Sequence, residues 1–234
     1  MIKSYVAQGI DDPSATARFS FGTDGFHGVI FYTDRPSFYI DPYTKNYNSY
    51  ISYSRSSLPQ IDHDCSCEVD EQLDAKEMVV SSRRNADDGL LRIFRLALVC
   101  SGEYAQFHLN DQGIASDASD ADKKAAVLSA MNTSMTRING VYERDLGVRM
   151  EIVDNNDQVI FLDAATDAIT DGNAGTMINQ VQTICDNTIG NANYDIGHIF
   201  SIGGSGLAGL GVVCLSGSKA RGVTGISTPM GDPY

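Results

Sequence analysis

The stretch that decides the fold covers residues 195–225 and reads DIGHIFSIGGSGLAGLGVVCLSGSKARGVTG. It begins with a short apolar run over 196–202, which predicts a buried strand, and passes through closely spaced glycines to a β-branched run over 212–214. We interpret the glycines as a hinge between two strands, where missing side chains let another backbone approach closely. An extended peptide can add itself to an exposed strand edge, so this segment is a candidate for holding a polypeptide.

The same glycines contain a rival pattern. Residues 204–209 fit G-x-G-x-x-G and follow a predicted strand, as a dinucleotide-binding turn does. That fingerprint also requires a helix directly after it and an acidic residue about 20 positions further on. Residues 210–215 are β-like instead, and the window near residue 229 reads Thr-Pro-Met-Gly. The context therefore does not support a nucleotide-dependent oxidoreductase.

Composition and charge exclude several classes of partner. The chain has 234 residues, enough for one large domain or two modest ones. Its formal net charge is −13 and it has no cluster of lysine and arginine, which argues against nucleic acid and membrane surfaces as partners. The acidity would suit calcium. No apolar stretch approaches the ~20 residues that span a bilayer, and no signal peptide is visible in the sequence.

Residues 1–58 are expected to form an antiparallel β domain. Alternating and aromatic runs predict short strands that are divided by turn pairs such as Asp24-Gly25. These predicted strands cover 17–21, 25–32, 37–40 and 50–53. Charged residues and serines dominate 55–89 without apolar periodicity, so we expect a linker or an extended arm there.

From residue 90 the pattern becomes that of an α/β domain. A strand is predicted over 91–99, and a capping box over 119–122 opens a helix. The apolar positions of this helix step by three and four residues and mark one core stripe: Leu128, Met131, Met135, Ile138 and Tyr142. The remaining elements are strands over 148–153 and 159–162, a helix over 174–189, and the glycine-rich stretch. This order implies right-handed crossovers and mostly parallel pairing, with a strand over 210–214 that turns back along the edge.

The residues alone show no complete catalytic centre. The four histidines are scattered and no H-E-x-x-H motif occurs, while His198, inside a predicted strand, is most simply a core histidine. A Ser–His–Asp site stays open because triads are recognised by geometry, but a G-x-S-x-G elbow is absent. Asp163, Asp167 and Asp171 lack the spacing of an EF-hand loop, and we interpret them as a surface turn.

The cysteines form no zinc-ribbon pattern. Their number is odd, so at least one thiol is unpaired within this chain: Cys65, Cys67, Cys100, Cys185 and Cys214. His63, Cys65 and Cys67 offer three soft donors within five residues, but no fourth partner is evident.

Several long segments resemble the catalytic domain of bacterial reprolysin-like (adamalysin-like) zinc metalloproteases, a family of the metzincin clan. Two of them read LRIFRLALVCSGEY and MTRINGVYERDL. In chain order the segments cover 91–104, 135–146, 193–200, 209–214 and 217–225, within residues 90–231. Residues 1–80 resemble the propeptide of the same proteins, notably GFHGVI over 25–30 and FYIDP over 38–42.

The resemblance implies a zinc endopeptidase of α/β (α+β) class: an N-terminal antiparallel β domain, then a mixed sheet with two helices and an antiparallel edge strand. In such enzymes three histidines hold zinc, and a glutamate assists the zinc-bound water that attacks the peptide carbonyl. The zinc-binding helix, its glutamate and the methionine turn have no counterpart in the sequence, which stops just short of that helix. We therefore expect no catalytic residue and no metal ligand in this chain, and we expect the chain by itself to be inactive.

The resemblance also suggests site residues. The edge strand would pair with extended substrate through the backbone of Gly209, Leu210, Gly211 and Val212. Cys67, or equally Cys65, is a candidate thiolate for a cysteine switch, in which the propeptide occupies the fourth zinc position. The dibasic pair Arg83-Arg84 is a candidate processing site, with a solvated charge pair as the alternative.

We thus expect a propeptide-like β domain and charged linker over 1–84, and the N-terminal part of a metzincin catalytic domain over 85–234. The expected protein is a secreted zymogen whose partners are a peptide or protein substrate and its own propeptide, with zinc in the full-length enzyme and calcium as an optional ion. The alternative is a non-catalytic peptide-binding or inhibitory module that uses the edge strand over 209–214.

Overall fold

The computed structural model describes residues 1–58, 67–70, 88–203 and 206–230. The chain divides into two compact units. Unit 1 comprises Met1–His63 and His108–Arg144, and unit 2 comprises Asp64–Phe107 and Asp145–Tyr234. The division at residue 84 stays a prediction.

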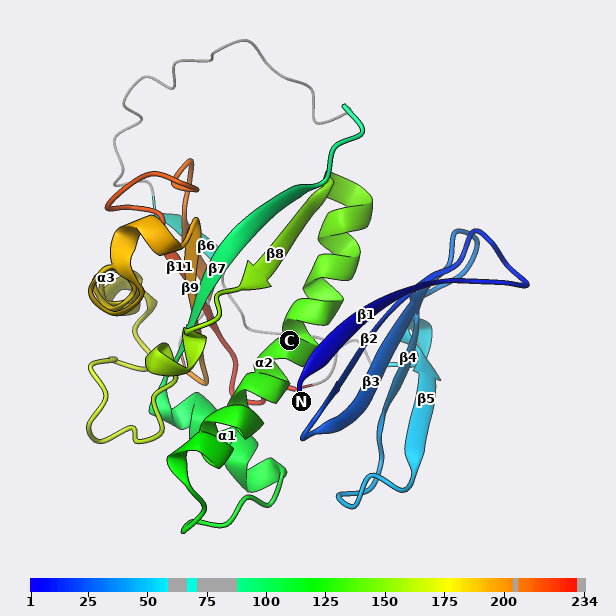
Figure 1. Cartoon of the computed structure of the whole chain (residues 1–234), viewed down its shortest axis with the longest axis horizontal. Coiled ribbons are helices and arrows are strands. Elements are labelled where there is room, and N and C mark those ends of the chain that lie inside the picture. The colour runs from blue at the N-terminus through cyan, green and yellow to red at the C-terminus, as the bar shows by residue number, and fades with distance from the viewer. Residues whose placement is uncertain (59–66, 71–87, 204–205, 231–234) are drawn as a thin grey trace. The chain divides into compact units, whose positions relative to one another are not determined.

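The sheet of unit 1 has five strands in the order β1-β2-β3-β4-β5, and every neighbouring pair is antiparallel. The antiparallel β domain expected near the N-terminus is thereby confirmed, although its first strand was missed. The strands are β1 (Lys3–Gln8), β2 (Thr16–Gly22), β3 (Gly25–Phe31), β4 (Phe38–Pro42) and β5 (Tyr50–Ser54), followed by a 3₁₀ turn at Arg55–Ser57 (Figure 1).

The two faces of this sheet differ in chemistry. One face carries a row of aromatic rings, with centroid distances of 5.2 Å for Tyr5–Phe19, 5.7 Å for Phe19–Phe26 and 6.2 Å for Phe26–Tyr50. Because side chains alternate along a strand, the residues between them point to the opposite face. That face packs on helix α2, where Ser20 Oγ lies 3.0 Å from Thr133 Oγ1.

Helix α2 (Asp120–Leu146) begins at the predicted capping box. Asp122 N donates to Ser119 Oγ at 3.1 Å, and Ser119 Oγ donates to Asp122 Oδ2 at 2.6 Å. Met131 and Met135 of the predicted core stripe are buried, whereas Tyr142 is 39% exposed. The predicted apolar stripe is therefore buried over only part of its length, and a second stripe of polar side chains is buried as well.

A helix was missed before α2. Residues 102–111 form α1 (Gly102–Asp111), for which no helix was predicted. Two side chains accept from backbone donors of its first turn: Gly102 N donates to Asp167 Oδ2 at 2.8 Å and Tyr104 N donates to Ser101 Oγ at 3.3 Å. Asp167 is distant in the sequence, whereas Ser101 directly precedes the helix and is a local capping signal that was not recognised.

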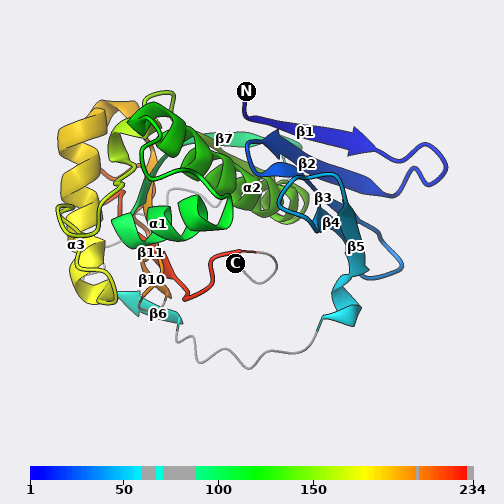
Figure 2. The same cartoon turned by 90° about the horizontal axis from the view of Figure 1, so that it is seen from below.

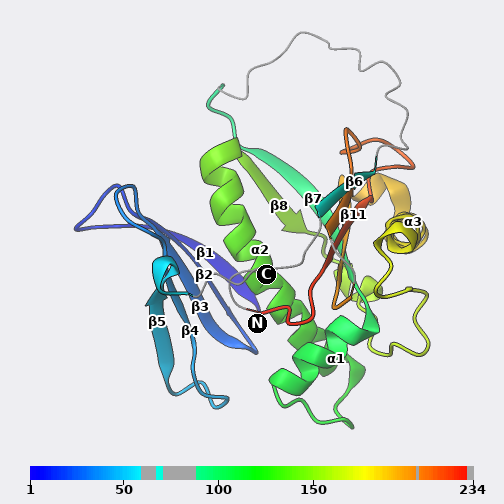
Figure 3. The same ribbon diagram turned by 180° about the vertical axis from the view of Figure 1, so that it is seen from behind.

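The sheet of unit 2 has six strands in the order β6-β10-β11-β9-β7-β8 and is mixed. The pairs β7–β8, β7–β9, β9–β11 and β6–β10 are parallel and β10–β11 is antiparallel, which confirms the mostly parallel pairing. The bounds are β6 (Cys67–Asp70), β7 (Arg92–Cys100), β8 (Val148–Ile152), β9 (Ile196–Ser201), β10 (Gly206–Gly209) and β11 (Gly222–Gly225) (Figure 3).

The predicted strand over 159–162 is wrong. Residues 156–159 form a 3₁₀ turn, η2 (Asn156–Val159), and pairing is limited to one bridge between Cys100 and Ile160. Asn156 explains the difference, since its side chain bonds to both the N–H and the C=O of Leu98 at 2.8 Å and so ties the turn to β7.

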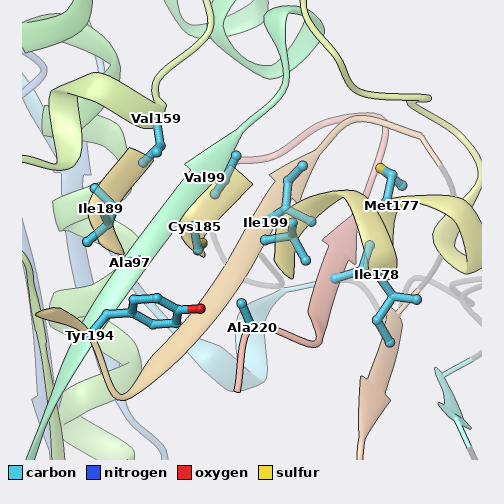
Figure 4. Close-up of a cluster of buried hydrophobic side chains, with 12 residues drawn as sticks. Ala97, Val99, Val159, Met177, Ile178, Cys185, Ile189, Tyr194, Ile199 and Ala220 are labelled. Atoms are coloured by element: carbon cyan, nitrogen blue, oxygen red, sulfur yellow. The ribbon is translucent and has the colours of Figure 1, made fainter. Parts of the chain in front are cut away.

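Helix α3 (Ala174–Ile184) covers the core of unit 2 and continues through a π turn at Cys185–Gly190. The Asn173 side chain caps its N-terminus by accepting from Thr176 N at 2.9 Å. The predicted helix over 174–189, with its end near Gly190, is confirmed. Figure 4 shows the buried cluster, whose members include Val99, Ile178 and Ile199. None of the described helices is both long and apolar enough to cross a lipid bilayer.

Candidate functional site: the strand β10 and its neighbours

The glycine-rich ribbon is a place of close backbone approach, as expected. A Cβ on Gly222 would lie 2.3 Å from Nδ1 of His198, and a Cβ on Gly225 would lie 2.1 Å from the carbonyl oxygen of Gly203. Contacts below 3 Å are not tolerated without movement. Glycine at these positions of β11 therefore lets this strand lie directly against β9 and the segment that follows it.

Strand β10 lies antiparallel to β11, with Leu207 opposite Val223 and Ala208 opposite Gly222. Gly209 N donates to the carbonyl of Arg221 at 2.9 Å and closes the pairing. The predicted antiparallel strand thus exists, but its predicted position over 210–214 is wrong. The strand comprises Gly206–Gly209, four residues earlier in the chain.

Residues 210–217 form turns instead of a strand because three of them have left-handed backbones. Gly211 has φ +67°, Cys214 has φ +62° and Gly217 has φ +78°. A strand requires negative φ, so pairing ends at Gly209. No helix follows β10, which removes the context that a dinucleotide-binding turn requires.

The four proposed substrate-binding residues occupy different environments. Gly209 is the last residue of β10, and Leu210 is 68% exposed in the turn beside Gly211. Val212 is buried, with 6% of its surface exposed. Leu210 presents an apolar side chain next to the strand, whereas Val212 anchors the turn.

The outer side of β10 is covered by β6, the last strand of the sheet. The pairing is parallel, with Gly206 opposite Cys67 and Gly209 opposite Asp70. Figure 2 shows β6 beside β10 and β11 at the border of this sheet. The proposed peptide-holding strand is therefore already paired on both sides, and its second neighbour comes from the charged arm.

Sequence reasoning missed β6. The four residues Cys67–Asp70 contain one β-branched residue, Val69, in a charged context, and 49% of the surface of Val69 is exposed. So short a strand is defined by its partner and not by its own pattern. Cys67 lies in this strand, while Cys65, Arg83 and Arg84 lie outside the described residues.

His198 is a structural histidine of β9. Its Nε2 lies 2.8 Å from Thr224 Oγ1 on β11. Burial lowers the pKa of His198 to about 4, so the ring is neutral at pH 7. Cys185 is a buried free thiol and Cys214 is an exposed one, and Cys100 is buried in β7.

The aspartates after η2 serve turns and a helix start. Asp163 Oδ1 accepts from Ala165 N at 2.9 Å, Asp167 Oδ2 accepts from Gly102 N at 2.8 Å, and Asp171 Oδ2 accepts from Ser101 Oγ at 2.6 Å. Within residues 1–58, 67–70, 88–203 and 206–230, no three histidine, cysteine, aspartate or glutamate side chains are grouped as metal ligands. The described residues thus do not fit a zinc site.

Comparison with known proteins gives one family match. Residues 128–233 match the family described as Metallo-peptidase family M12B, reprolysin-like. The match covers β8 to β11 and most of α2 and confirms the resemblance to a reprolysin-like metzincin, whereas the resembling segments over 1–80 and 91–104 lie outside it. A search of curated proteins finds no match.

Proposed function

We propose that this chain, a reprolysin-like M12B metallopeptidase by the family match of residues 128–233, is part of a secreted zinc endopeptidase that its N-terminal region keeps latent. The single observation that carries the proposal is the position of β6 along β10. The family supplies the reaction class, hydrolysis of peptide bonds. The described residues supply a strand that an extended peptide would join.

An extended substrate and β6 compete for the same side of β10. Strand addition works through the N–H and C=O groups of a strand edge, and each edge accepts one partner. The opposite side of β10 is taken by β11. A peptide therefore gains access to the backbone around Gly209 only when the segment Cys67–Asp70 has left.

The zinc-binding part has to come from outside these residues, since the sequence contains no H-E-x-x-H motif. When bound, zinc would supply the Lewis acidity for hydrolysis. This chain contributes the substrate strand and the segment that covers it. Cys67 or Cys65 as the switch thiolate, and Arg83-Arg84 as the processing site, complete the proposal.

Peptidase activity is tested on the protein extended past Tyr234. We expect it to cleave unfolded protein substrates after removal of the N-terminal region, and we expect a zinc chelator to stop the cleavage. If the longer protein contains a zinc-binding helix beyond Tyr234 and still shows no cleavage that a chelator stops, the enzyme assignment is overturned.

The role of β6 is tested with two double variants. Replacing Glu68 and Val69 by proline removes two backbone donors and breaks the strand, whereas replacing both by alanine keeps the donors. We expect the proline variant to bind a fluorescent extended peptide at least about tenfold more tightly than the alanine variant, measured by anisotropy. Equal affinities would contradict the competition.

The alternative is a peptide-binding or inhibitory module that does not cleave its ligand. The pairing of β6 along β10 supports it, because this side of the strand accepts an extended segment without any metal. A stop codon directly after Tyr234, together with peptide binding by the proline variant, would support this alternative over the enzyme.

A further inference from the structure

The buried face of α2 that meets the five-stranded sheet is polar. Six of its residues recur at three- and four-residue steps, which places them on one side of the helix. They are Ser129, Thr133, Thr136, Arg137, Gly140 and Glu143. Every one of them contacts a residue of the segment 1–58.

A charged cluster lies at the centre of this contact. His27 Nδ1 lies 2.6 Å from Asp41 Oδ1, and its Nε2 lies 3.4 Å from Asp24 Oδ2. Arg137 of α2 donates to Asp41 Oδ1 at 2.5 Å, and Tyr53 donates to Asp41 Oδ2 at 2.6 Å. Two carboxylates of the sheet thus face one cation of the sheet and one of the helix.

Further polar contacts continue along the helix on both sides of this cluster. Thr133 Oγ1 donates to Asp24 Oδ2 at 3.0 Å, and Ser129 Oγ donates to the other oxygen of Asp24. At the far end, Arg18 pairs with Glu143, and both side chains are mostly buried. Two residues of this helix face, Arg137 and Glu143, thus form ion pairs with the segment 1–58.

The packing leaves no spare space at one glycine. A Cβ on Gly140 would lie 2.6 Å from Cε2 of Phe31 and 2.9 Å from Cγ of Arg18. Glycine in the interior of a helix costs stability relative to alanine. Its presence at the contact lets the sheet and α2 approach closely.

The two sides of the contact lie on opposite sides of the connection over 59–87. The sheet side comes from the segments around His27 and Asp41, whereas the helix side comes from α2 (Asp120–Leu146). The contact would therefore persist as an interface between two pieces if the connection were cut.

We propose that the β1–β5 sheet is a non-covalent partner of α2 that stays bound after the connecting chain is cut, so that processing and release are separate steps. The contacts described above are the evidence that the sheet stays bound to α2. The consequence, that the enzyme stays latent after the connecting chain is cut, rests on the proposed protease function.

The test uses the full chain with a recognition sequence for a specific protease inserted in 59–66. This position leaves β6 with the C-terminal piece, so that α2 alone has to retain the sheet. After cutting, we expect both pieces to elute together in gel filtration under native conditions. Separation of the pieces would overturn the proposal, and because no activity is measured, this result is independent of the protease assignment.

Substitutions identify the contact that retains the sheet. Asp41→Asn or Arg137→Gln removes the ion pair between sheet and helix in this buried cluster, and we expect the cut pieces to bind about 100-fold more weakly in either variant. The matched control is Arg35→Gln, because Arg35 is 55% exposed and its partners are residues of the sheet segment itself, Asp12, Asp34 and Tyr32. Unchanged binding in both the Asp41 and the Arg137 variant would overturn the proposal.

A steric variant covers the case in which a charge variant fails to fold. Gly140→Val replaces no charged residue but places methyl groups where Phe31 and the stem of Arg18 lie. We expect it to speed release of the cut sheet at least about tenfold. Retention at the unaltered rate would show that the sheet is not seated on α2 and would overturn the proposal.

Discussion

The charge state of His27 follows from what surrounds its ring. Burial lowers the pKa of His27, but the hydrogen bonds and charges of Asp24 and Asp41 outweigh burial and raise it to about 9. No carboxylate of the described residues acts on His198, and burial lowers its pKa to about 4. Two histidines of one chain therefore respond to pH in opposite directions.

The first prediction concerns this pH dependence. The folded pKa of His27 lies above its unfolded value, so its contribution of about 3 kcal/mol at most is complete below about pH 6.5 and is lost as the pH rises through 9. For His198 the folded pKa is depressed, so stability is lost as the pH falls from 6.5 towards 4. Hydrogen exchange should show β3 losing protection in alkali and β9 in acid.

His27→Gln is the control for the alkaline change, since it removes the titrating group and keeps a polar side chain. We expect this variant to be less stable near neutral pH and to lose less stability than the unaltered protein as the pH rises through 9. If the loss of stability at high pH is unchanged, another group causes it.

The second prediction concerns Gly222. Gly222→Ala places a methyl group against the His198 ring, and we expect a loss of about 1–3 kcal/mol in the free energy of unfolding. Gly175→Ala is the control because the nearest atom to its Cβ is 3.6 Å away and the residue lies in α3. That substitution should be neutral or stabilising by up to about 1 kcal/mol. Denaturant melts measure both.

At the scale of the element, sequence patterns predicted the helices and strands whose structure is set by their own residues. Helix α2 has a capping box, and β7 and β9 have continuous apolar runs, so these elements were predicted correctly. Helix α1 was missed although Ser101, directly before it, is a local capping residue, and its other capping partner, Asp167, lies far away in the sequence.

The polar face of α2 shows why the candidate contact could not be predicted. Periodicity assigns serine, threonine and arginine to solvent, and polar partners on the sheet such as the carboxylates of Asp24 and Asp41 make their burial favourable. Strand β6 could not be predicted either, since its four residues form a strand only by pairing with β10.

The third prediction concerns the segment that contains β6. In the longer zymogen, Cys67→Ser should raise basal activity if this thiolate occupies the metal, because a hydroxyl is a much weaker zinc ligand. Cys65→Ser tests the other candidate thiol in the same way, and the double variant tests substitution of one thiol by the other. Unchanged latency in the double variant would remove the switch from the mechanism and leave strand competition.

At the scale of the whole molecule, the N-terminal region is attached to the rest of the chain in two ways. The sheet contacts α2 through buried ion pairs, and β6 contacts β10 through the backbone. The attachments differ in chemistry, so they respond to different changes. A charge variant such as Arg137→Gln affects the first, and proline in β6 affects the second.

The last prediction compares cuts at 59–66 and at 71–87. The later cut leaves the sheet and β6 on one piece, so both attachments must open together before that piece is lost. Because the second contact forms within the bound complex, release after the later cut should be slower, by up to about 10²–10⁴-fold. Introducing the two prolines in β6 should abolish the difference, whereas the two alanines should preserve it. Equal release rates from the unaltered chain would show that one attachment contributes nothing, and the proline variant would then identify which one.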